Sequence, residues 1–382
     1  MEFRFHNISQ RPYRINNVDR IPTPRLLVFE DRIFNNIETM RRLLAAANPQ
    51  LSLANVCPHV KTHKSKWVTQ ILLDAGISSF KTTLNELSML IDAGARDIFI
   101  AYPLLEHDAV TVRDAMFSHP DIQFYVQVAH PEHVDILKRC TTSDTLTWNY
   151  VIDVNIGMNR TGGSPEKALE LYQQLKADPR FQFAGIHGYD GHIHHTSAEE
   201  RREQAFHSMQ RLYDVVFEFH ESGVPIPQTV VGGTPSFLQD AAFFAETPIP
   251  SQLYVSPGTW VYFDTVSQDM MPDTFDIAAV ILTQVMDKPT PDSVTLNIGH
   301  KRWAVDQGPI DTFSIPEMRA LHWNEEHTVV YVPQDENVHI GDYVLLAPRH
   351  VCPTVNLWEF FGIIDASGNM VSTESPVDAR NR

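Results

Sequence analysis

Residues 58–64, Pro-His-Val-Lys-Thr-His-Lys, place a lysine between two histidines near the end of a predicted strand. Side chains alternate along a strand, so we expect His59, Lys61 and His63 on one face. If that face is buried, desolvation lowers the pKa of Lys61 and frees an amine that can form a Schiff base. The alternative is a solvated basic loop, because two more lysines follow within five residues of Lys61.

Two turns that contain glycine, at residues 230–235 and 256–259, follow two apolar segments that have the length of strands. Glycines let backbone N–H groups approach an anion, and threonine hydroxyls add donors. In barrels the loops after strands 7 and 8 often form a phosphate site, so the two turns together predict a phosphate-bearing cofactor. Each turn alone is also typical of ordinary loops. The glycines and threonines of the two turns that could supply such donors are Gly233, Thr234, Gly258 and Thr259.

Two further loops carry groups that suit an aromatic, anionic cofactor. Arg160 lies in residues 153–162, where a guanidinium could hold an anionic oxygen, although a surface arginine at a helix entry is equally consistent. Tyr189 lies in residues 185–192, where its ring could stack on a heteroaromatic cofactor. The histidines that follow at 192, 194 and 195 could indicate a metal, but a histidine-rich loop is more often solvated.

His350 and Cys352 are separated by one residue in the segment 348–354. On an extended segment both side chains would point the same way and offer two ligands to zinc or a similar metal. Two ligands leave coordination positions open for water and substrate. The alternative is a buried cysteine beside an unrelated histidine.

Short apolar segments alternate with amphipathic ones over residues 52–258, which predicts parallel strands joined by helices. Eight such units favour a (β/α)8 TIM-like barrel over an open sheet. The predicted strands are Ser52–Val60, Ile77–Lys81, Ile98–Tyr102, Ile122–Val126, Trp148–Asp153, Phe183–His187, Thr229–Gly232 and Leu253–Ser256. The predicted helices are Leu84–Ala93, His107–Phe117, Pro131–Cys140, Pro165–Ala177 and Ala198–Glu221.

The pattern becomes mostly β after residue 264, which predicts a second, smaller β domain at the C-terminal end. The expected boundaries are 26–264 for the barrel, 1–25 plus 265–372 for the β domain, and 373–382 for a frayed tail. The predicted strands of the second domain are Ile277–Val285, Ser293–Ile298, Thr328–Val332 and Tyr343–Ala347.

Composition narrows the classes of function. The 382 residues carry a formal net charge of −17, which disfavours nucleic-acid partners. No apolar segment approaches the length of a signal peptide core or a membrane span, and three cysteines do not make a disulfide framework. We therefore expect a cytoplasmic protein without nucleic-acid or membrane partners.

The order PHVKTHK, IGMNRTG, YDGH, GGT, PGT and HVCPTVNL resembles the fold-type III pyridoxal-phosphate enzymes. It is most similar to the D-serine dehydratase and D-threonine aldolase group, which has the N-terminal barrel of alanine racemase. The resemblance spans residues 20 to 365 and depends most on the first and last segments.

By that resemblance Lys61 would be the Schiff-base lysine, and the four residues of the glycine turns would hold the cofactor phosphate. Arg160 would lie near the phenolic oxygen of the cofactor, and Tyr189 would line its ring. His350 and Cys352 would bind a divalent metal. A thiolate ligand favours zinc, with manganese, cobalt and magnesium as alternatives. Related barrels often pair, so the resemblance also implies a homodimer.

The resemblance implies a lyase that acts on a D-3-hydroxy amino acid. Dehydration and deamination, as of D-serine or D-3-hydroxyaspartate, is favoured because the H-x-C pair resembles the dehydratases. The alternative is retro-aldol cleavage to glycine and an aldehyde, as in D-threonine aldolase. Lys61 would remove the Cα proton, and His59 is a candidate base at the hydroxyl group.

Other functions stay open. A racemase is disfavoured because it needs no metal pair, and a non-catalytic pyridoxal-phosphate-binding protein because such proteins lack a second domain. A barrel that binds some other phosphate compound is the remaining alternative. Three positions depart from the usual pattern of the group and leave the substrate open, namely Trp260, Asn297 and Arg349.

Overall fold

The computed structural model describes residues 1–141, 146–334 and 336–380. The chain divides into two compact units. The α/β unit consists of residues 40–61 and 66–258, and the β unit consists of residues 1–39, 62–65 and 259–382. The domain boundaries expected from the sequence stay a prediction.

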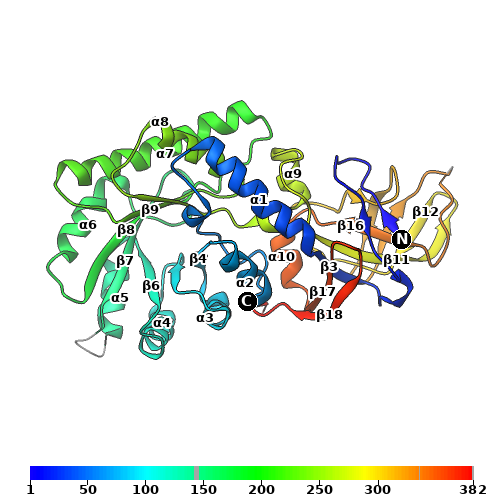
Figure 1. Ribbon diagram of the computed structural model, residues 1–382, viewed down its shortest axis with the longest axis horizontal. Coiled ribbons are helices and arrows are strands. Elements are labelled where there is room, and N and C mark those ends of the chain that lie inside the picture. Colours follow the sequence, from blue (N-terminus) through cyan, green and yellow to red (C-terminus); the bar gives the residue numbers. More distant parts are fainter. Residues whose placement is uncertain (142–145, 335, 381–382) are drawn as a thin grey trace. The chain divides into compact units, whose positions relative to one another are not determined.

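A parallel sheet forms the centre of the α/β unit (Figure 1). Its seven strands, counted over the described residues, follow the order β10-β9-β8-β7-β6-β5-β4, and every neighbouring pair is parallel. The strands are β4 (Ser79–Thr82), β5 (Asp97–Ile100), β6 (Gln123–Val128), β7 (Trp148–Val154), β8 (Phe181–Gly188), β9 (Gln228–Val231) and β10 (Gln252–Val255). Each lies within two residues of a strand predicted from the sequence, because continuous apolar segments are typical of buried parallel strands.

The strand predicted over Ser52–Val60 is wrong as a regular element. A 3-10 turn occupies Leu53–Asn55, and only isolated parallel bridges follow it, from Val56 to Val255 and from His59 to Lys81. These bridges connect the segment to both edge strands of the sheet, β10 and β4. The predicted parallel α/β sheet is therefore confirmed with seven strands over the described residues, and its closure into an eight-stranded barrel stays a prediction.

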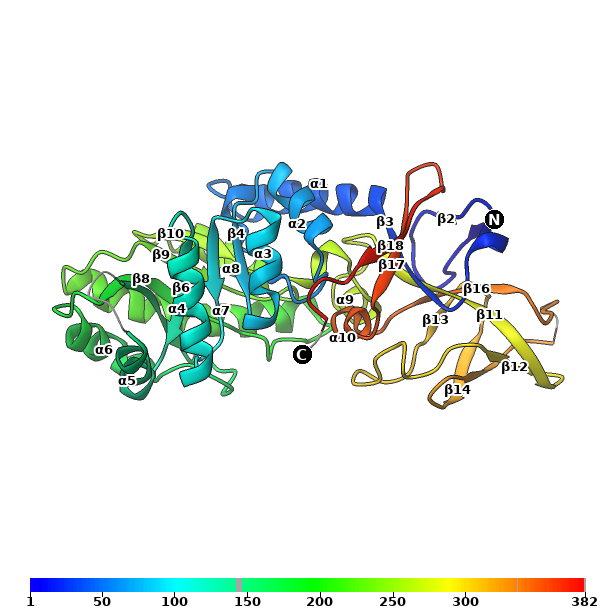
Figure 2. The same cartoon turned by 90° about the horizontal axis from the view of Figure 1, so that it is seen from below.

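Helices connect successive strands and lie along the outside of the sheet (Figures 1 and 2). Those of the α/β unit are α2 (Lys66–Asp74), α3 (Leu87–Ala93), α4 (Glu106–Ser118), α5 (Pro131–Cys140), α6 (Ala168–Leu175), α7 (Ala198–Glu221) and α8 (Phe237–Glu246). Helices α5 and α7 begin and end at the predicted residues. Proline at the first position of α5 and the Ser197 cap of α7 mark those starts in the sequence.

The β unit is built around β11 (Ala279–Thr290), which pairs antiparallel with β3, β12 and β16. The mostly β second unit is thereby confirmed. Its other strands are β1 (Glu2–Phe3), β2 (Tyr13–Arg14), β3 (Arg25–Phe29), β12 (Ser293–Leu296), β13 (Thr312–Phe313), β14 (Arg319–Trp323), β15 (Thr328–Tyr331), β16 (Tyr343–Ala347), β17 (Phe360–Ile364) and β18 (Met370–Pro376). Two short helices also belong to it, α9 (Thr265–Met270) and α10 (Val351–Asn356), and α1 (Glu30–Ala47) follows β3.

The frayed tail expected over 373–382 is wrong for its described residues. Strand β18 continues to Pro376 and pairs with β17, and Val377 and Ala379 are buried. The carbonyl oxygen of Ala379 accepts a hydrogen bond from Lys64 Nζ at 3.0 Å. Apolar side chains among the polar residues of the tail stabilise it against the unit.

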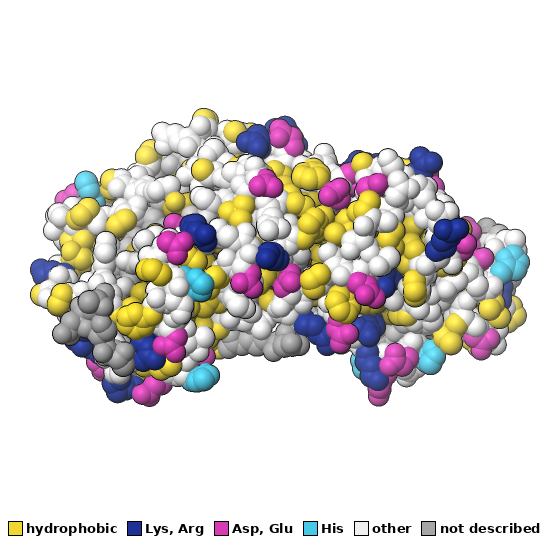
Figure 3. All heavy atoms as spheres, turned by 60° about the horizontal axis from the view of Figure 1, so that its bottom comes forward, with side chains coloured by type: hydrophobic (Ala, Val, Ile, Leu, Met, Phe, Trp, Pro, Cys, Tyr) yellow, Lys and Arg dark blue, Asp and Glu magenta, His cyan; other side chains and the backbone are white. Residues whose placement is uncertain are grey.

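The surface carries both signs of charge. On the face drawn in Figure 3, acidic and basic side chains lie interspersed between apolar ones. Within the described residues, no helix combines the length and the apolar character that a membrane span requires.

Gly185 allows β8 and β9 to approach closely. A Cβ atom at this position would lie 2.1 Å from the carbonyl oxygen of Gln228. We expect Gly185→Ala to lower the free energy of unfolding by about 2–4 kcal/mol, because the methyl group must push the two strands apart. The control is Gly94→Ala, which also has a positive φ but no described atom within 4 Å of the added methyl, and should cost about 1 kcal/mol. Equal losses in urea unfolding of the two variants would contradict the close approach.

Candidate functional site

Lys61 lies where the irregular segment of the α/β unit ends in a turn. The turn covers residues 60–63, so strand alternation stops at Val60 and gives no common face to His59, Lys61 and His63. Lys61 and His59 are both half-buried. The backbone N–H of Lys61 donates to His59 Nδ1 at 3.2 Å, which leaves the proton of a neutral His59 ring on Nε2.

A second lysine, Lys81 on β4, is more deeply buried than Lys61. Its Nζ donates to His187 Nε2 at 2.7 Å and to Ser256 Oγ at 3.0 Å. Burial lowers the pKa of Lys81 to about 8, with Lys61 and Arg160 acting in the same direction. The structure therefore has a half-buried amine at position 61, as expected from the sequence, and a second, fully buried amine at position 81.

His187 connects Lys81 to a carboxylate. Its Nδ1 donates to Asp153 Oδ1 at 2.6 Å, and Gln127 Nε2 donates to the other oxygen of Asp153 at 2.5 Å. Burial and the neighbouring Lys81 lower the pKa of His187 to about 4, although Asp153 acts in the opposite direction. His187 is therefore neutral at physiological pH, with Nδ1 as its donor and Nε2 as its acceptor.

Tyr189, two residues beyond His187, presents its ring to two cations. Lys81 Nζ lies 5.1 Å and Arg160 Cζ lies 5.0 Å from the ring centroid. Both distances are typical of cation–π contacts. The structure thus brings together two predicted cofactor-binding residues, Arg160 and Tyr189, with Lys81, which was not predicted.

The turn after β9 lies against a pair of buried acids. A Cβ atom at Gly232 would lie 2.4 Å from Asp240 Oδ2, so only glycine fits there. Burial raises the pKa of Asp190 and of Asp240, and the charge of Asp190 adds to the rise at Asp240. Raised pKa values favour the protonated forms and so reduce the negative charge beside the turn.

Gly233 and Thr234 are buried in this turn, and Gly258 is half-buried in the turn after β10. The two turns are connected through Ser256. Its Oγ donates to the carbonyl oxygen of Gly232 at 3.0 Å, and its backbone N–H donates to that of Val231 at 2.8 Å.

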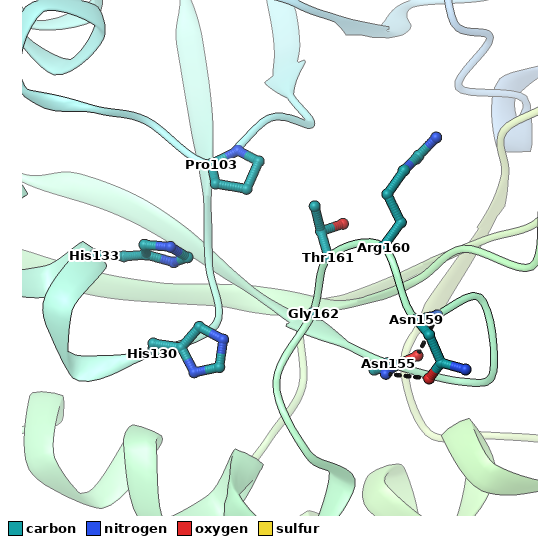
Figure 4. A pocket seen from close by; sticks show the side chains of 8 residues that line it. All are labelled: Pro103, His130, His133, Asn155, Asn159, Arg160, Thr161 and Gly162. Carbon is teal, nitrogen blue, oxygen red and sulfur yellow. Dashed lines mark hydrogen bonds between the residues drawn. The ribbon is translucent and has the colours of Figure 1, made fainter.

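A cavity of about 330 Å³ is lined by the loop that carries Arg160 (Figure 4). Figure 4 shows the Arg160 side chain pointing away from His130 and His133, which line another part of the cavity. Arg160 thus contributes to the cavity wall, while its Cζ lies 5.0 Å from the centre of the Tyr189 ring.

In the β unit, His350 and Cys352 lie at the start of α10. The extended H-x-C segment expected from the sequence is wrong at Cys352, because helix α10 begins at Val351. Asp264 Oδ2 accepts a hydrogen bond from the Val351 N–H at 3.0 Å and satisfies the first turn of the helix. Pro353 is compatible with a first turn, since its missing N–H has no partner to lose there.

The imidazole of His350 nevertheless contacts both a thiol and a carboxylate. It hydrogen-bonds to Cys352, and its Nδ1 lies 2.5 Å from Asp306 Oδ2. Burial opposes the charged ring, but the bonds to Cys352 and Asp306 outweigh it and raise the pKa of His350 to about 9. An aspartate behind a histidine fixes the ring orientation, as is common behind metal-binding histidines.

Two threonine hydroxyls also lie near the thiol. Thr62 Oγ1 is 3.1 Å and Thr259 Oγ1 is 3.8 Å from Cys352 Sγ. Over the described residues, no group of three or more His, Cys, Asp or Glu side chains could hold a metal ion. The pair thus remains a two-ligand arrangement with Asp306 behind it.

The three departures from the group pattern have structural partners. Asn297 Oδ1 accepts from Thr283 Oγ1 at 2.6 Å and from the Gln284 N–H at 2.9 Å. Arg349 pairs with two aspartates, at 2.7 and 3.0 Å. Trp260 is fully buried, and its ring centroid lies 6.0 Å from that of Phe275. Hydrogen bonds and ion pairs within the β unit account for Asn297 and Arg349, and Trp260 packs in the core of that unit without a hydrogen bond from its Nε1 to any described residue.

Sequence reasoning missed Lys81, His187, Asp153 and Asp306. A signal existed for the first three, because each falls near the C-terminal end of a predicted strand with apolar neighbours. A charged residue within such a segment needs a buried partner. Asp306 carries no comparable signal, since it lies in an irregular loop 44 residues before His350.

Comparisons with known proteins agree with these two units. The family profile described as "Alanine racemase, N-terminal domain" matches residues 28–266, and the profile described as "Putative serine dehydratase domain" matches residues 278–364. The chain is 27% identical over 332 residues to the D-threonine aldolase of Arthrobacter sp., covering 85% of this chain and 84% of that protein.

Two further similarities are informative. The chain is 25% identical over 295 residues to the D-threo-3-hydroxyaspartate dehydratase of Delftia sp. (strain HT23), covering 75% of this chain and 70% of that protein. The crystal structure of the D-threonine aldolase from Filomicrobium marinum matches with a TM-score of 0.86 at 22% identity, over 97% of this chain and 98% of that one. The match to this crystal structure shows a shared fold. The profile of the alanine racemase N-terminal domain covers more than half of the chain, and this protein therefore belongs to that family.

Proposed function

We propose that this chain is a lyase that acts on D-3-hydroxy amino acids with pyridoxal phosphate and a divalent metal. The observation that carries the proposal is the contact of His350 with both Cys352 and Asp306. A racemase or a non-catalytic cofactor-binding protein has no use for a thiol–imidazole pair supported in this way. The relatives named as a D-threonine aldolase and a dehydratase support the same class of reaction.

The residues of the α/β unit fit pyridoxal phosphate. Lys61 would hold the cofactor covalently through its half-buried amine. Arg160 would face the phenolic oxygen and Tyr189 would line the ring. Gly233 suits a close approach, since a Cβ atom there would lie 3.2 Å from the Tyr189 ring. The proposed phosphate-binding residues are Gly233, Thr234, Gly258 and Thr259.

The residues of the β unit fit a divalent metal. His350 and Cys352 would be its protein ligands, and Asp306 would orient the imidazole. A thiolate and an imidazole together favour zinc over magnesium or manganese. With two protein ligands, positions remain for water and for the substrate hydroxyl and carboxylate groups.

When bound, pyridoxal phosphate supplies an electron sink for charge released at Cα, and the metal supplies a Lewis acid at the hydroxyl group. The protein supplies the proton transfers. Lys61 Nζ is proposed to remove the proton from Cα of the substrate.

His59 can place a hydrogen bond at the substrate hydroxyl group. Because His59 Nδ1 accepts from the Lys61 N–H, the proton of the neutral ring lies on Nε2. This N–H would orient the hydroxyl oxygen in either reaction. Dehydration is proposed first because the pair formed by His350 and Cys352 resembles that of the dehydratases.

Retro-aldol cleavage is the second candidate. The similarity to the D-threonine aldolases, in sequence and in fold, favours it. In that reaction the Cα–Cβ bond breaks and yields glycine and an aldehyde.

Three finer assignments belong to the same proposal. We infer that residues 56–60, which bridge to both β10 and β4, take the place of the eighth strand of a closed barrel. A homodimer and a cytoplasmic location are proposed on the likeness to the pyridoxal-phosphate enzymes of this group.

Products identify the reaction. We expect purified protein, supplied with pyridoxal phosphate and zinc, to convert D-serine to pyruvate and D-3-hydroxyaspartate to oxaloacetate, each with one ammonia. Glycine together with an aldehyde or glyoxylate would establish the aldolase instead. Keto-acid assays, ammonia assays and chromatography of glycine separate the two reactions. The proposal fails if neither set of products forms.

Lys61→Ala should abolish the visible absorbance band of lysine-bound pyridoxal phosphate, because no other amine is expected to replace it. Lys66→Ala, which removes a lysine at the start of α2, is the control and should keep the band. A band of unchanged position and intensity in Lys61→Ala would assign the covalent role to another lysine.

Cys352→Ala should keep the absorbance band but lose the bound metal and at least about a hundredfold of the activity, since the Lewis acid is lost. Cys140→Ala removes a buried thiol from α5 and serves as the control. Metal content is measured by atomic spectroscopy. Full activity and full metal content in Cys352→Ala would refute the metal site.

A further inference from the structure

The buried ammonium group of Lys81 is connected to both glycine turns of the α/β unit. Lys81 Nζ donates to Ser256 Oγ at 3.0 Å, and Ser256 Oγ donates in turn to the carbonyl oxygen of Gly232 at 3.0 Å. Ser256 begins one turn and Gly232 begins the other. Because an ammonium can only donate, Ser256 Oγ accepts a hydrogen bond from Lys81, and its own proton points at the carbonyl oxygen of Gly232.

The same ammonium is fixed from its other side. His187 Nε2 accepts from Lys81 Nζ at 2.7 Å, and His187 Nδ1 donates to Asp153. Three strands, β4, β7 and β8, therefore determine where the charge lies. The chain of hydrogen bonds has one consistent set of donors and acceptors from Asp153 to Gly232.

Burying a cation is costly, because the charged form loses its hydration. Replacing a buried charged residue by an apolar one of similar size is often neutral or stabilising. Lys81 is 4% exposed, and the negative charge of Asp153 is connected to its ammonium group only through the neutral imidazole of His187. Such an arrangement leaves positive potential for an anion at the neighbouring turns.

We propose that Lys81 is a positioning residue for the phosphate group of the cofactor, which orients the Gly232 and Ser256 turns through Ser256 Oγ and attracts the phosphate by its charge. This inference rests on the proposed function, and it adds a residue that neither the sequence motifs nor the related proteins' names indicate. A phosphate dianion beside a buried ammonium is held more strongly than in water, because the local dielectric constant is lower.

The charged and titratable groups around Lys81 are consistent with this role. Burial raises the pKa of Asp190 and of Asp240 near the Gly232 turn, which weakens their opposition to the positive potential. The titratable and charged groups that face Lys81 from the surrounding elements are Cys57, Lys61, Asp153, Arg160, His187, Tyr189 and Asp190.

The test compares pyridoxal phosphate with pyridoxal, which lacks the phosphate group. Both can bind Lys61 and produce an absorbance band, so the ratio of their dissociation constants isolates the contribution of the phosphate. In Lys81→Met we expect this ratio to fall by about ten- to a hundredfold, the effect of losing one charge-assisted interaction. Ser256→Ala keeps the charge and breaks the link to Gly232, and should lower the ratio by less.

Lys138→Met is the matched control. Lys138 belongs to α5 and pairs with Asp178 at 3.8 Å, so this substitution removes the same charge elsewhere in the unit. A merely structural role for Lys81 would weaken both ligands alike and leave the ratio unchanged, which would overturn the proposal. Titration of each protein with inorganic phosphate in a calorimeter gives the same comparison without Lys61.

The pH dependence has a defined sign. Lys81 is charged below its pKa of about 8 and loses its charge above it, so the ratio for the wild type should fall between about pH 7 and pH 9.5. Bound phosphate raises that pKa and shifts the fall to higher pH. Lys81→Met should show no such fall.

A band that persists in Lys61→Ala would defeat the proposed function alone, whereas a wild-type ratio in Lys81→Met would defeat this inference alone.

Discussion

A cation buried within a parallel sheet must find its counter-charge inside the chain, and this requirement organises the α/β unit. Lys81 meets it through His187 and Asp153, which come from two other strands. Because each of the three side chains needs the others, β4, β7 and β8 must keep one register. The close approach at Gly185 places β8, and hence His187 and Tyr189, against β9.

Two acids of the same unit are buried as well, and burial acts on them in the opposite direction. It raises the pKa of Asp190 and of Asp240 near the Gly232 turn, and the charge of Asp190 adds to the rise at Asp240. Two fully charged carboxylates would repel a phosphate at that turn, and raised pKa values weaken this repulsion. The buried cation of Lys81 and the raised pKa values of the acids therefore both suit an anionic ligand.

Much of the fold could be predicted from the sequence, because apolar segments of strand length alternate with amphipathic segments. The strand over Ser52–Val60 could not be placed correctly. Its residues suit a strand, but they form a 3-10 turn and isolated bridges. The strand β3 and the helices α1, α2 and α8 were missed, since each joins a neighbour that is distant in sequence or lacks clear cap residues.

The candidate site could also be predicted from the sequence only in part. Motif spacing identified Lys61, Arg160, Tyr189, His350 and Cys352, whose roles stay proposals. The network that supports them was not visible, because pairs such as Lys81 with His187 are 106 residues apart in the chain. The H-x-C segment was taken as a strand, while Asp264 caps a helix there. Sequence spacing shows which groups are present, and only the fold shows which of them share a partner.

Each proposed binding site is supported inside its own unit. The Lys81 network involves residues of the α/β unit alone, and Asp306 with His350 and Cys352 belongs to the β unit. The alanine racemase N-terminal profile matches the first region, and the serine dehydratase profile matches the second. Under the proposed function, most of the residues that would hold pyridoxal phosphate lie in the α/β unit, and those that would hold the metal lie in the β unit. Thr259 is the exception, because it belongs to the β unit and its Oγ1 lies 3.8 Å from Cys352 Sγ. Substitutions near Cys352 would therefore be the ones expected to change the reaction while cofactor binding is kept.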